Sequence, residues 1–412
     1  MQTKTTLPCL LLLMLVGAAG AGETDALSRE LLADAAARVS FQGGSTAGHD
    51  GKFFLASADG SSRLNVSGQI QVRYHLNLRE TTSPDKDLAN GFSMRRTKIG
   101  FDGVVAGDWE YKLVGAFDRD GGSYFLEDAI LSREFANGIM LTWGQFKAPF
   151  LREENVSSKM QLAVERSPMN EAFNQDRTQG IRLGYAGERL RVVGMVSEGF
   201  KTLNTAYYST KEADIALTGR AEFRFGEASW KTFKDFTSFR NGPAGGMVGG
   251  AVHWQTAGNT GNTDTFGGTA ATERDMLTYT LDVSYEGGGW NLYGAFVGRN
   301  TDAAGSPDYD DFGALLQGGA FVNEQTELFA RWDAVFPDDS RVSGEDFHTL
   351  TFGANHYFFP GSHAAKLTAD VQWYLDDQVG SGSVVKVNEG VGLLPTTGDD
   401  QISFRLQMQL LF

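Results

Sequence analysis

Basic side chains at even spacings along alternating segments are the residues of this chain best suited to chemistry. Arg220 and Arg224 lie four residues apart, with Glu222 midway between them. In other alternating segments, basic residues likewise occupy the polar set of alternate positions, which we call inward parity: Arg73, Arg96, Lys98, Lys112, Arg182, Arg191, Arg331 and Arg405. Guanidinium and ammonium groups gathered on one surface can attract an anion and replace part of its hydration shell.

Carboxylates on the same surface allow a second interpretation. Five acidic residues occupy the same set of alternate positions as the basic residues: Glu110, Glu127, Asp282, Asp333 and Asp370. The two sets of charges can pair and keep the protein rigid, or they can create a transverse field of both signs. Both roles can hold at once, so parity alone does not separate them.

The elements that position these residues must be β-strands, because side chains two residues apart share a face in extended backbone. The alternation is clearest in residues 63–78 and in residues 402–412, at the end of the chain. It recurs in 97–103, 109–117, 124–135, 139–146, 179–185, 190–196, 215–225, 248–256, 277–285, 290–298, 312–322, 328–336, 350–358 and 367–375. The count is about sixteen, an even number as closed bacterial membrane barrels require.

The N-terminal residues predict export from the cytoplasm. Within residues 1–21, Lys4 supplies a positive charge, residues 7–16 an apolar core and residues 19–21 a small-residue cleavage site, which is typical of a signal peptide. The only cysteine is Cys9, inside this segment. The mature chain therefore cannot be stabilised by disulfides.

The remaining chain divides into an extension and one large β architecture. Residues 22–62 are predicted to form a periplasmic helix, at 27–39, followed by a linker, and residues 63–412 the barrel. No uninterrupted apolar run of transmembrane-helix length follows the signal. The net charge of -15 excludes nucleic-acid binding through an overall positive field. No motif predicts a cofactor or a metal site.

Connection lengths predict the orientation of the barrel. Short connections alternate with long ones, and membrane barrels have short periplasmic turns and long outer loops. Residues 228–245 break the rule, because they are long for the periplasmic side. No role is predicted for them.

These features favour a membrane barrel over a soluble sandwich. A strand protein can cross lipid only as a closed barrel, and about sixteen strands enclose a water-filled channel. Aromatic residues on the opposite face fit a girdle at the membrane surface: Trp109, Tyr111, Trp254, Tyr285, Trp290, Trp332 and Trp373. The prediction is an outer-membrane channel for passive diffusion of small hydrophilic solutes and ions.

Several motifs resemble those of a known family. Residues 144–150 (GQFKAPF), 157–159 (SSK) and 165–167 (ERS) resemble the signature of the phosphate-selective porin O and P family. Arg95-Arg96 before residues 99–101, residues 108–111 (DWEY) and residues 127–129 (EDA) resemble its early strands. The resemblance implies an all-β, transmembrane antiparallel barrel of sixteen strands, generally trimeric, whose third outer loop folds inward and narrows the pore.

That loop corresponds to residues 148–177 and has a mixed charge. It carries four cations, Arg152, Lys159, Arg166 and Arg177, and five carboxylates, Glu153, Glu154, Glu165, Glu171 and Asp176, which gives a net charge of -1. The resemblance adds Arg152, Lys159 and Arg166 to the expected pore lining. A phosphate filter needs an excess of positive charge at its narrow point. The basic residues of the wall lead to an expected anion preference, whereas the mixed charge of the loop leaves phosphate specificity open.

The last residue, Phe412, resembles the signal that outer-membrane assembly machinery reads on the C-terminal strand. Expected partners are this machinery, outer-membrane lipid and lipopolysaccharide, and further copies of the chain in a homotrimer.

Two other classes of protein are compatible with parts of the sequence. A hydrolase inside the barrel could use His75 or His253, which have inward parity, with a serine and an acid. A surface adhesin could use the acidic outer loops, where Asp310 and Asp311 or Asp338 and Asp339 could bind divalent cations.

Overall fold

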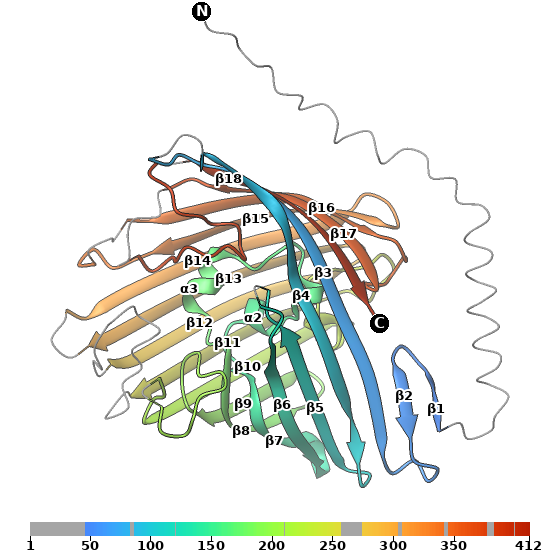
Figure 1. Cartoon of the computed structure of the whole chain (residues 1–412). Helices are drawn as coiled ribbons and strands as arrows, with labels where there is room; N and C mark the ends of the chain where they lie inside the picture. The colour runs from blue at the N-terminus through green and yellow to red at the C-terminus, as the bar shows by residue number, and fades with distance from the viewer. Residues whose placement is uncertain are drawn as a thin grey trace, which may run out of the picture.

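The computed structural model describes residues 46–412, apart from 83–85, 120, 210, 257–273, 304–306, 342–344, 377–382 and 399. The strands form one antiparallel sheet (Figure 1). Their bounds are β1 Ala47–His49, β2 Phe53–Ala56, β3 Arg63–Leu78, β4 Leu88–Val105, β5 Trp109–Phe117, β6 Tyr124–Phe135, β7 Ile139–Lys147, β8 Arg177–Ala186, β9 Leu190–Ser197, β10 Ile215–Gly226, β11 Gly245–Thr256, β12 Arg274–Gly287, β13 Trp290–Ala303, β14 Tyr309–Phe321, β15 Thr326–Phe336, β16 Phe347–Tyr357, β17 Ala365–Tyr374 and β18 Gln401–Leu411.

Strands β3 to β18 close into a barrel of sixteen strands, as the sequence predicts. Each pairs with the next along the chain, and β18 pairs with β3 to complete the ring. Closure gives every strand two hydrogen-bonded neighbours, which satisfies the backbone without water. No helix among the described residues is long and apolar enough to cross a membrane.

The two faces of the barrel differ as the alternation predicts. On β18, Phe404, Leu406, Met408 and Leu410 are exposed on the outer surface, whereas the residues between them are buried. The predicted girdle tryptophans also lie on the outer surface, each more than a third exposed: Trp109, Trp254, Trp290, Trp332 and Trp373. An apolar exterior of this kind suits hydrocarbon rather than water.

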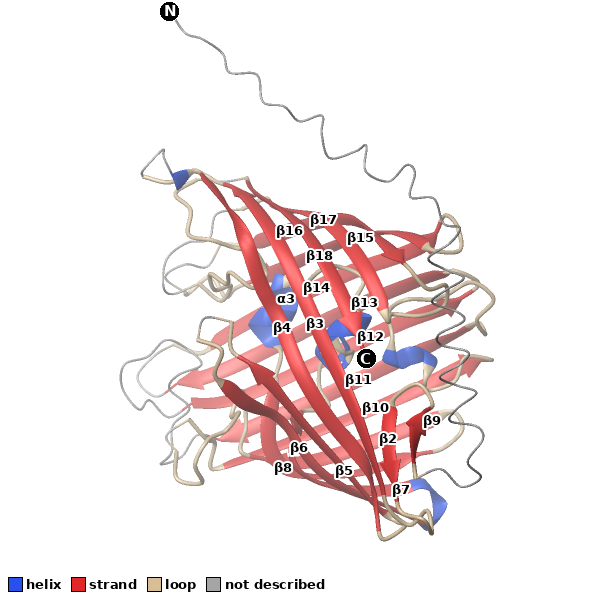
Figure 2. Ribbon diagram, turned by 45° about the vertical axis from the view of Figure 1, so that its right-hand side comes forward, coloured by secondary structure: helices blue, strands red, loops and turns tan. Residues whose placement is uncertain are grey.

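The N-terminal part of the described chain forms a small hairpin beside the barrel. Strand β1 pairs with β2, and β2 pairs with residues 63–66 of β3. Strand β18 reaches only Gln69 of β3, so β2 occupies the part of the β3 edge that β18 leaves unpaired. Figure 2 shows β2 below the C-terminus. The end of the predicted linker is thus structured, and the predicted helix at 27–39 lies outside the described residues.

A β-bulge interrupts the pairing of β3 with β4. Gln71 pairs with Arg96 and Val72 with Met94, so Arg95 is an extra residue on β4. A bulge re-aims the side chains next to it. Strict alternation would turn Arg95 away from the face that holds Arg96, and for this reason the sequence pattern missed it.

Short helices lie in the connections rather than in the wall. Between β7 and β8 are α2 Arg152–Asn155, the 3-10 turn η3 Ser158–Met160 and α3 Pro168–Phe173. The hydroxyl of Ser167 accepts the amide of Asn170 and caps α3, with Pro168 in the first turn. Two other 3-10 turns are η2 Ala136–Gly138 and η4 Thr232–Lys234.

Candidate channel interior

The segment between β7 and β8, residues 148–176, packs against the inner face of the barrel. Its side chains Phe150, Leu162, Met169 and Phe173 are at most 1% exposed. They form one cluster with residues of β11 and β13 to β17: Ala251, Tyr293, Ala295, Val297, Leu315, Phe329, Val335, Phe347 and Tyr374. Figure 1 shows α2 and α3 within the ring of strands, and Figure 2 shows α3 in the same place. The inner face, which the sequence predicts to be polar, is therefore partly apolar on this side.

Hydrogen bonds hold the same segment at its middle. Arg331 donates to the carbonyl of Glu165 at 2.9 Å, and the amide of Val164 donates to Asp370 at 2.9 Å. Farther along, the amide of Met169 donates to Asp333 at 3.2 Å. Because buried polar groups need partners, these inward-facing side chains fix the path of the segment.

The long connection between β10 and β11, residues 227–244, reaches the same cluster from the end of the barrel where the other turns are short. Phe236 belongs to the cluster and its amide donates to the carbonyl of Met160 at 3.2 Å. Arg152 donates to the carbonyls of Phe233, at 3.0 Å, and Asp235, at 3.2 Å. The segment for which the sequence predicts no role is thus in contact with the β7–β8 segment.

Most of the predicted pore-lining cations contact carboxylates. The ion pairs are Arg73 and Arg96 with Glu165, Lys98 with Glu127, Lys112 with Asp128, Arg152 with Glu286, Arg166 with Glu154, Arg191 with Glu222, Arg220 with Glu222 and Asp282, Arg331 with Glu153 and Asp333, and Arg405 with Asp370. This is the pairing that the mixed charge pattern allows. In these ten residues most of the positive charge is balanced within the protein.

Three predicted cations have no carboxylate contact within the described part of the chain: Lys159, Arg182 and Arg224. The guanidinium of Arg182 lies 4.8 Å from the ring centre of Phe146 and donates to Thr142 at 3.4 Å. Arg224 donates to the carbonyl of Ala228 at 2.7 Å. No carboxylate neutralises these three charges by direct contact, which distinguishes Arg182 and Arg224 of the wall and Lys159 of the β7–β8 segment from the other ten cations.

Glu165 lies at the centre of three arginines. Its carboxylate accepts from Arg73 at 3.2 Å, Arg95 at 2.8 Å and Arg96 at 2.5 Å, and all four residues lie deep in the barrel. Burial alone would raise the pKa of the Glu165 carboxyl, but the guanidiniums hold this pKa well below its usual range. Arg95 takes part because of the bulge, which parity could not reveal.

A second charged cluster joins four strands. Arg177 on β8 binds Glu127 at 3.0 Å and Asp128 at 2.7 Å, both on β6. The same carboxylates bind Lys98 of β4 and Lys112 of β5. Lys112 stays about half exposed, at 48% of its side chain, so this cluster still presents charge to solvent.

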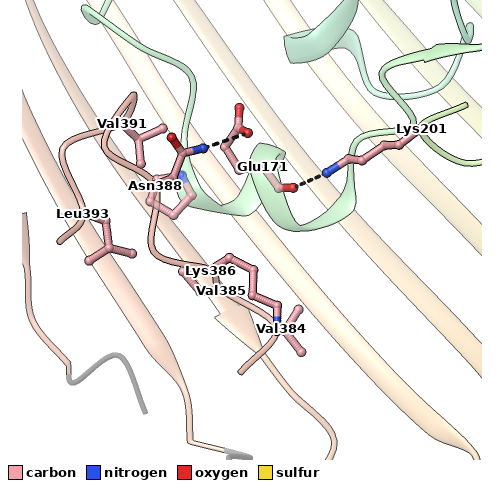
Figure 3. A pocket seen from close by; sticks show the side chains of 9 residues that line it. Glu171, Lys201, Val384, Val385, Lys386, Asn388, Val391 and Leu393 are labelled. Carbon is pink, nitrogen blue, oxygen red and sulfur yellow. Dashed lines mark hydrogen bonds between the residues drawn. The ribbon is translucent and has the colours of Figure 1, made fainter. Parts of the chain in front are cut away.

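A cavity of ≈ 120 Å³ opens between α3, residue 201 and the β17–β18 connection. Its lining is Pro168, Glu171, Lys201, Val384, Val385, Lys386, Asn388, Val391 and Leu393 (Figure 3). Lys201 donates to the carbonyl of Glu171 at 3.0 Å, and Asn388 approaches its carboxyl at 3.5 Å. Burial, opposed by Lys201 and reinforced by Glu154 and Glu165, raises the pKa of the Glu171 carboxyl to about 7.

The histidines considered for hydrolysis have other contacts. His253 interacts with Thr218 at 2.8 Å and with Gln255 at 3.1 Å. His75 interacts with Ser93 at 3.2 Å, and among the described residues no carboxylate contacts its ring. A histidine without an acid lacks the group that orients a catalytic imidazole.

Asp310 and Asp311, which the sequence predicts to lie in an acidic outer loop, are part of strand β14. Asp311 is buried and accepts from Arg299 at 3.0 Å and from Arg341 at 2.6 Å. In the parts of the chain that the structure describes, no group of three or more acidic, histidine or cysteine side chains has the arrangement of a metal site.

Comparison with known proteins agrees with this geometry. The model of a family described as phosphate-selective porin O and P matches residues 64–374. An anion-selective porin from Comamonas acidovorans is 14% identical with a TM-score of 0.56, covering 85% of this chain and 100% of that chain. OmpT of Vibrio cholerae, in its trimer form, is also 14% identical with a TM-score of 0.56, and the match again covers 85% of this chain and 100% of that chain. The channel DcaP of Acinetobacter baumannii is 12% identical with a TM-score of 0.54, covering 86% of this chain and 99% of that one. At such identities the structures share the fold, and no curated protein sequence matches.

Proposed function

The chain belongs to the phosphate-selective porin O and P family, and from this premise we propose that it passes small hydrophilic solutes and ions across the outer membrane with a preference for anions. Family and fold make it a porin channel rather than an enzyme. The observation that carries the preference is the set of predicted pore-lining cations without a carboxylate contact in the described chain, Lys159 of the β7–β8 segment and Arg182 and Arg224 of the wall. An anion gains from these charges.

The charges inside the barrel argue against strict phosphate selection. The β7–β8 segment with Arg177 has a net charge of -1, and the basic residues around Glu165 are already bound to a carboxylate. A multiply charged anion would have to displace that carboxylate to bind there. We therefore propose general anion preference.

Planar-bilayer recording of the purified protein tests this function. Reversal potentials in KCl gradients should indicate chloride preference, and phosphate titrated into chloride should block only weakly. A cation-selective channel would contradict the anion preference, and strong phosphate block would restore phosphate selection. If no channel forms, the transport function itself is wrong.

We also propose that residues 148–176 are the inward-folded third outer loop, and that they narrow the channel. Their contacts with β3, β15 and β17 through Arg73, Arg331 and Asp370 support this assignment. The short-turn end of the barrel would then face the periplasm. The cavity beside Glu171 would lie at the outer entrance, where solutes arrive.

The state of the mature protein follows from the same proposal. Residues 1–21 would be removed on export, and residues 22–62 would lie on the periplasmic side, with the hairpin of β1 and β2 at the barrel rim. Three copies would associate in the outer membrane, in contact with lipid and lipopolysaccharide, after assembly directed by the strand that ends at Phe412. The trimer form of the OmpT structure supports the number of copies. Chemical cross-linking of the detergent-extracted protein would test it.

A further inference from the structure

We infer that residues 227–244, the connection between β10 and β11, are an internal strap that positions the β7–β8 segment and limits the conductance of the channel. The inference rests on the proposed function, because it concerns the same constriction. It adds a positioning element at the opposite end of the barrel from the loop itself.

The strap differs from the other turns at its end of the barrel. Residues 106–108, 187–189 and 322–325 connect their strands with three or four residues, whereas the strap has 18 residues, from 227 to 244. Phe233 and Phe236 are 3% and 1% exposed. A water-exposed turn would not bury two phenylalanines, so the strap enters the barrel rather than extending from it.

The middle of the strap is joined to the β7–β8 segment. The guanidinium of Arg152 lies 4.6 Å from the ring centre of Phe236, and it donates to strap carbonyls at Phe233 and Asp235. The amide of Phe236 donates to Met160 in η3. The ring of Phe236 also lies 4.8 Å from that of Tyr293 on β13. Phe236 thus fills the space between the wall, α2 and η3.

One flank of the strap is attached at the β8–β9 turn. The indole of Trp230 donates to the carbonyl of Gly187 at 2.8 Å. The guanidiniums of Arg191 and Arg224 lie 4.8 and 5.6 Å from its ring centre, respectively. Cation–π contacts of this kind stabilise an aromatic side chain next to wall cations.

The other flank is attached to β14, β16 and the β16–β17 turn. The hydroxyls of Thr237 and Tyr357 share a hydrogen bond of 2.8 Å, and a carboxylate oxygen of Asp235 lies 2.8 Å from Nε2 of His363. Phe239 packs against Phe321 and Tyr357, with ring centres at 5.5 and 5.0 Å. The strap therefore crosses the interior from the β8–β9 turn to β14 and β16, and it contacts the β7–β8 segment on the way.

This crossing has two physical consequences. It occupies part of the cross-section that solutes would otherwise use. It also supplies carbonyl partners for Arg152, whose one carboxylate partner among the described residues is Glu286 at 2.9 Å. Without the strap the first part of the β7–β8 segment loses support on one side. The constriction should then become both wider and less rigid.

Single-channel recording of Phe236→Ala and of a variant with residues 229–243 replaced by Asn-Gly tests the inference. The Asn-Gly pair favours a two-residue hairpin turn. Conductance should rise about twofold in the shortened variant, as expected when pore cross-section limits the current, and Phe236→Ala should show increased open-channel noise. Phe223→Ala is the matched control, because Phe223 is an outward-facing phenylalanine of β10, 48% exposed, and its loss should leave the conductance unchanged.

Two further measurements keep the outcome decisive. The gel mobility of unheated samples reports whether each barrel has folded, and Phe236→Leu, which keeps the apolar volume, should restore the quiet wild-type current if Phe236→Ala folds poorly. Wild-type conductance and noise in both the folded shortened variant and Phe236→Ala would overturn the inference. Absence of any channel in the wild type would instead contradict the proposed function.

Discussion

Arg405 on β18 and Asp370 on β17 are direct partners across the strand pair, and two guanidinium nitrogens meet the two carboxylate oxygens at 2.7 and 2.8 Å. Both side chains are fully buried. Asp370 also accepts the amide of Val164, so this ion pair links the last strand of the barrel to the β7–β8 segment.

Replacing Asp370 with Asn should destabilise the protein, because the charge of Arg405 would remain buried without its partner. The expected loss is about 3–5 kcal/mol of unfolding free energy. Urea titration of the folded barrel, followed by gel mobility, measures it. The double variant Asp370→Asn, Arg405→Gln removes both charges and should regain part of the loss. Equal stability of the single variant and the wild type would contradict this role.

Arg182→Ala should change selectivity without a comparable loss of stability. No carboxylate contacts Arg182 in the described chain, so its removal leaves no buried negative charge unpaired. The ratio of chloride to potassium permeability should fall by about twofold on loss of one wall charge. Reversal potentials in KCl gradients measure the change. A ratio equal to that of the wild type would remove Arg182 from the selectivity determinants.

Arg220→Ala should lower stability as well as change selectivity, unlike Arg182→Ala, because Arg220 binds Glu222 and Asp282 at 2.9 and 2.7 Å. Its removal leaves Asp282 without a cation partner in the described chain, whereas Glu222 keeps Arg191. The reversal potential should shift toward cations more strongly than in Arg182→Ala, and the barrel should unfold at lower urea concentration. Arg220→Lys, which keeps the charge, is the control. A shift no larger than that of Arg182→Ala would contradict the ion-pair account.

Anion preference should depend on pH near neutrality through Glu171, whose pKa is raised to about 7. Below pH 7 the carboxyl is protonated and the positive charge of Lys201 beside it is less opposed. Above pH 7 the carboxylate is ionised and reduces the local attraction for anions. The chloride permeability ratio should thus be higher at pH 6 than at pH 8. Glu171→Gln should remove this difference, and persistence of the difference in that variant would assign it to another group.

Deletion of Phe412 should reduce the amount of assembled barrel. The backbone of Phe412 exchanges two hydrogen bonds with Gly68, at 2.7 and 3.2 Å. Its ring covers this glycine so closely that a Cβ built on Gly68 would lie 2.1 Å from the ring. Gly68→Val should therefore displace the ring while leaving the C-terminal sequence intact. Unheated gels of outer-membrane fractions measure assembly, and normal assembly of both variants would contradict a role for this contact.

The ring of strands could be predicted from the sequence because the alternation in segments such as 63–78 and 402–412 is a local property of extended chain. Closure followed from the need to satisfy the backbone in lipid. The inward parity of Arg73, Arg220 and Arg405 was predicted by the same reasoning. Each of these three side chains is indeed buried inside the barrel.

The parts that sequence reasoning missed depend on contacts between distant segments. Arg95 joins the cluster around Glu165 only because a bulge adds one residue to β4. Phe236 is buried by Arg152 and Tyr293, which lie far from it in sequence. Periodicity contains no signal for either feature, since each depends on the path of a connection rather than on the strand pattern.

The hairpin of β1 and β2 bears on whether separate molecules can pair through their strand edges. Strand β18 ends before it covers residues 63–66 of β3, and β2 pairs with these residues instead. An uncovered strand edge offers free amide and carbonyl groups to any other extended chain. By occupying this edge with residues of the same polypeptide, β2 protects the rim from sheet growth between neighbouring molecules and thus from aggregation.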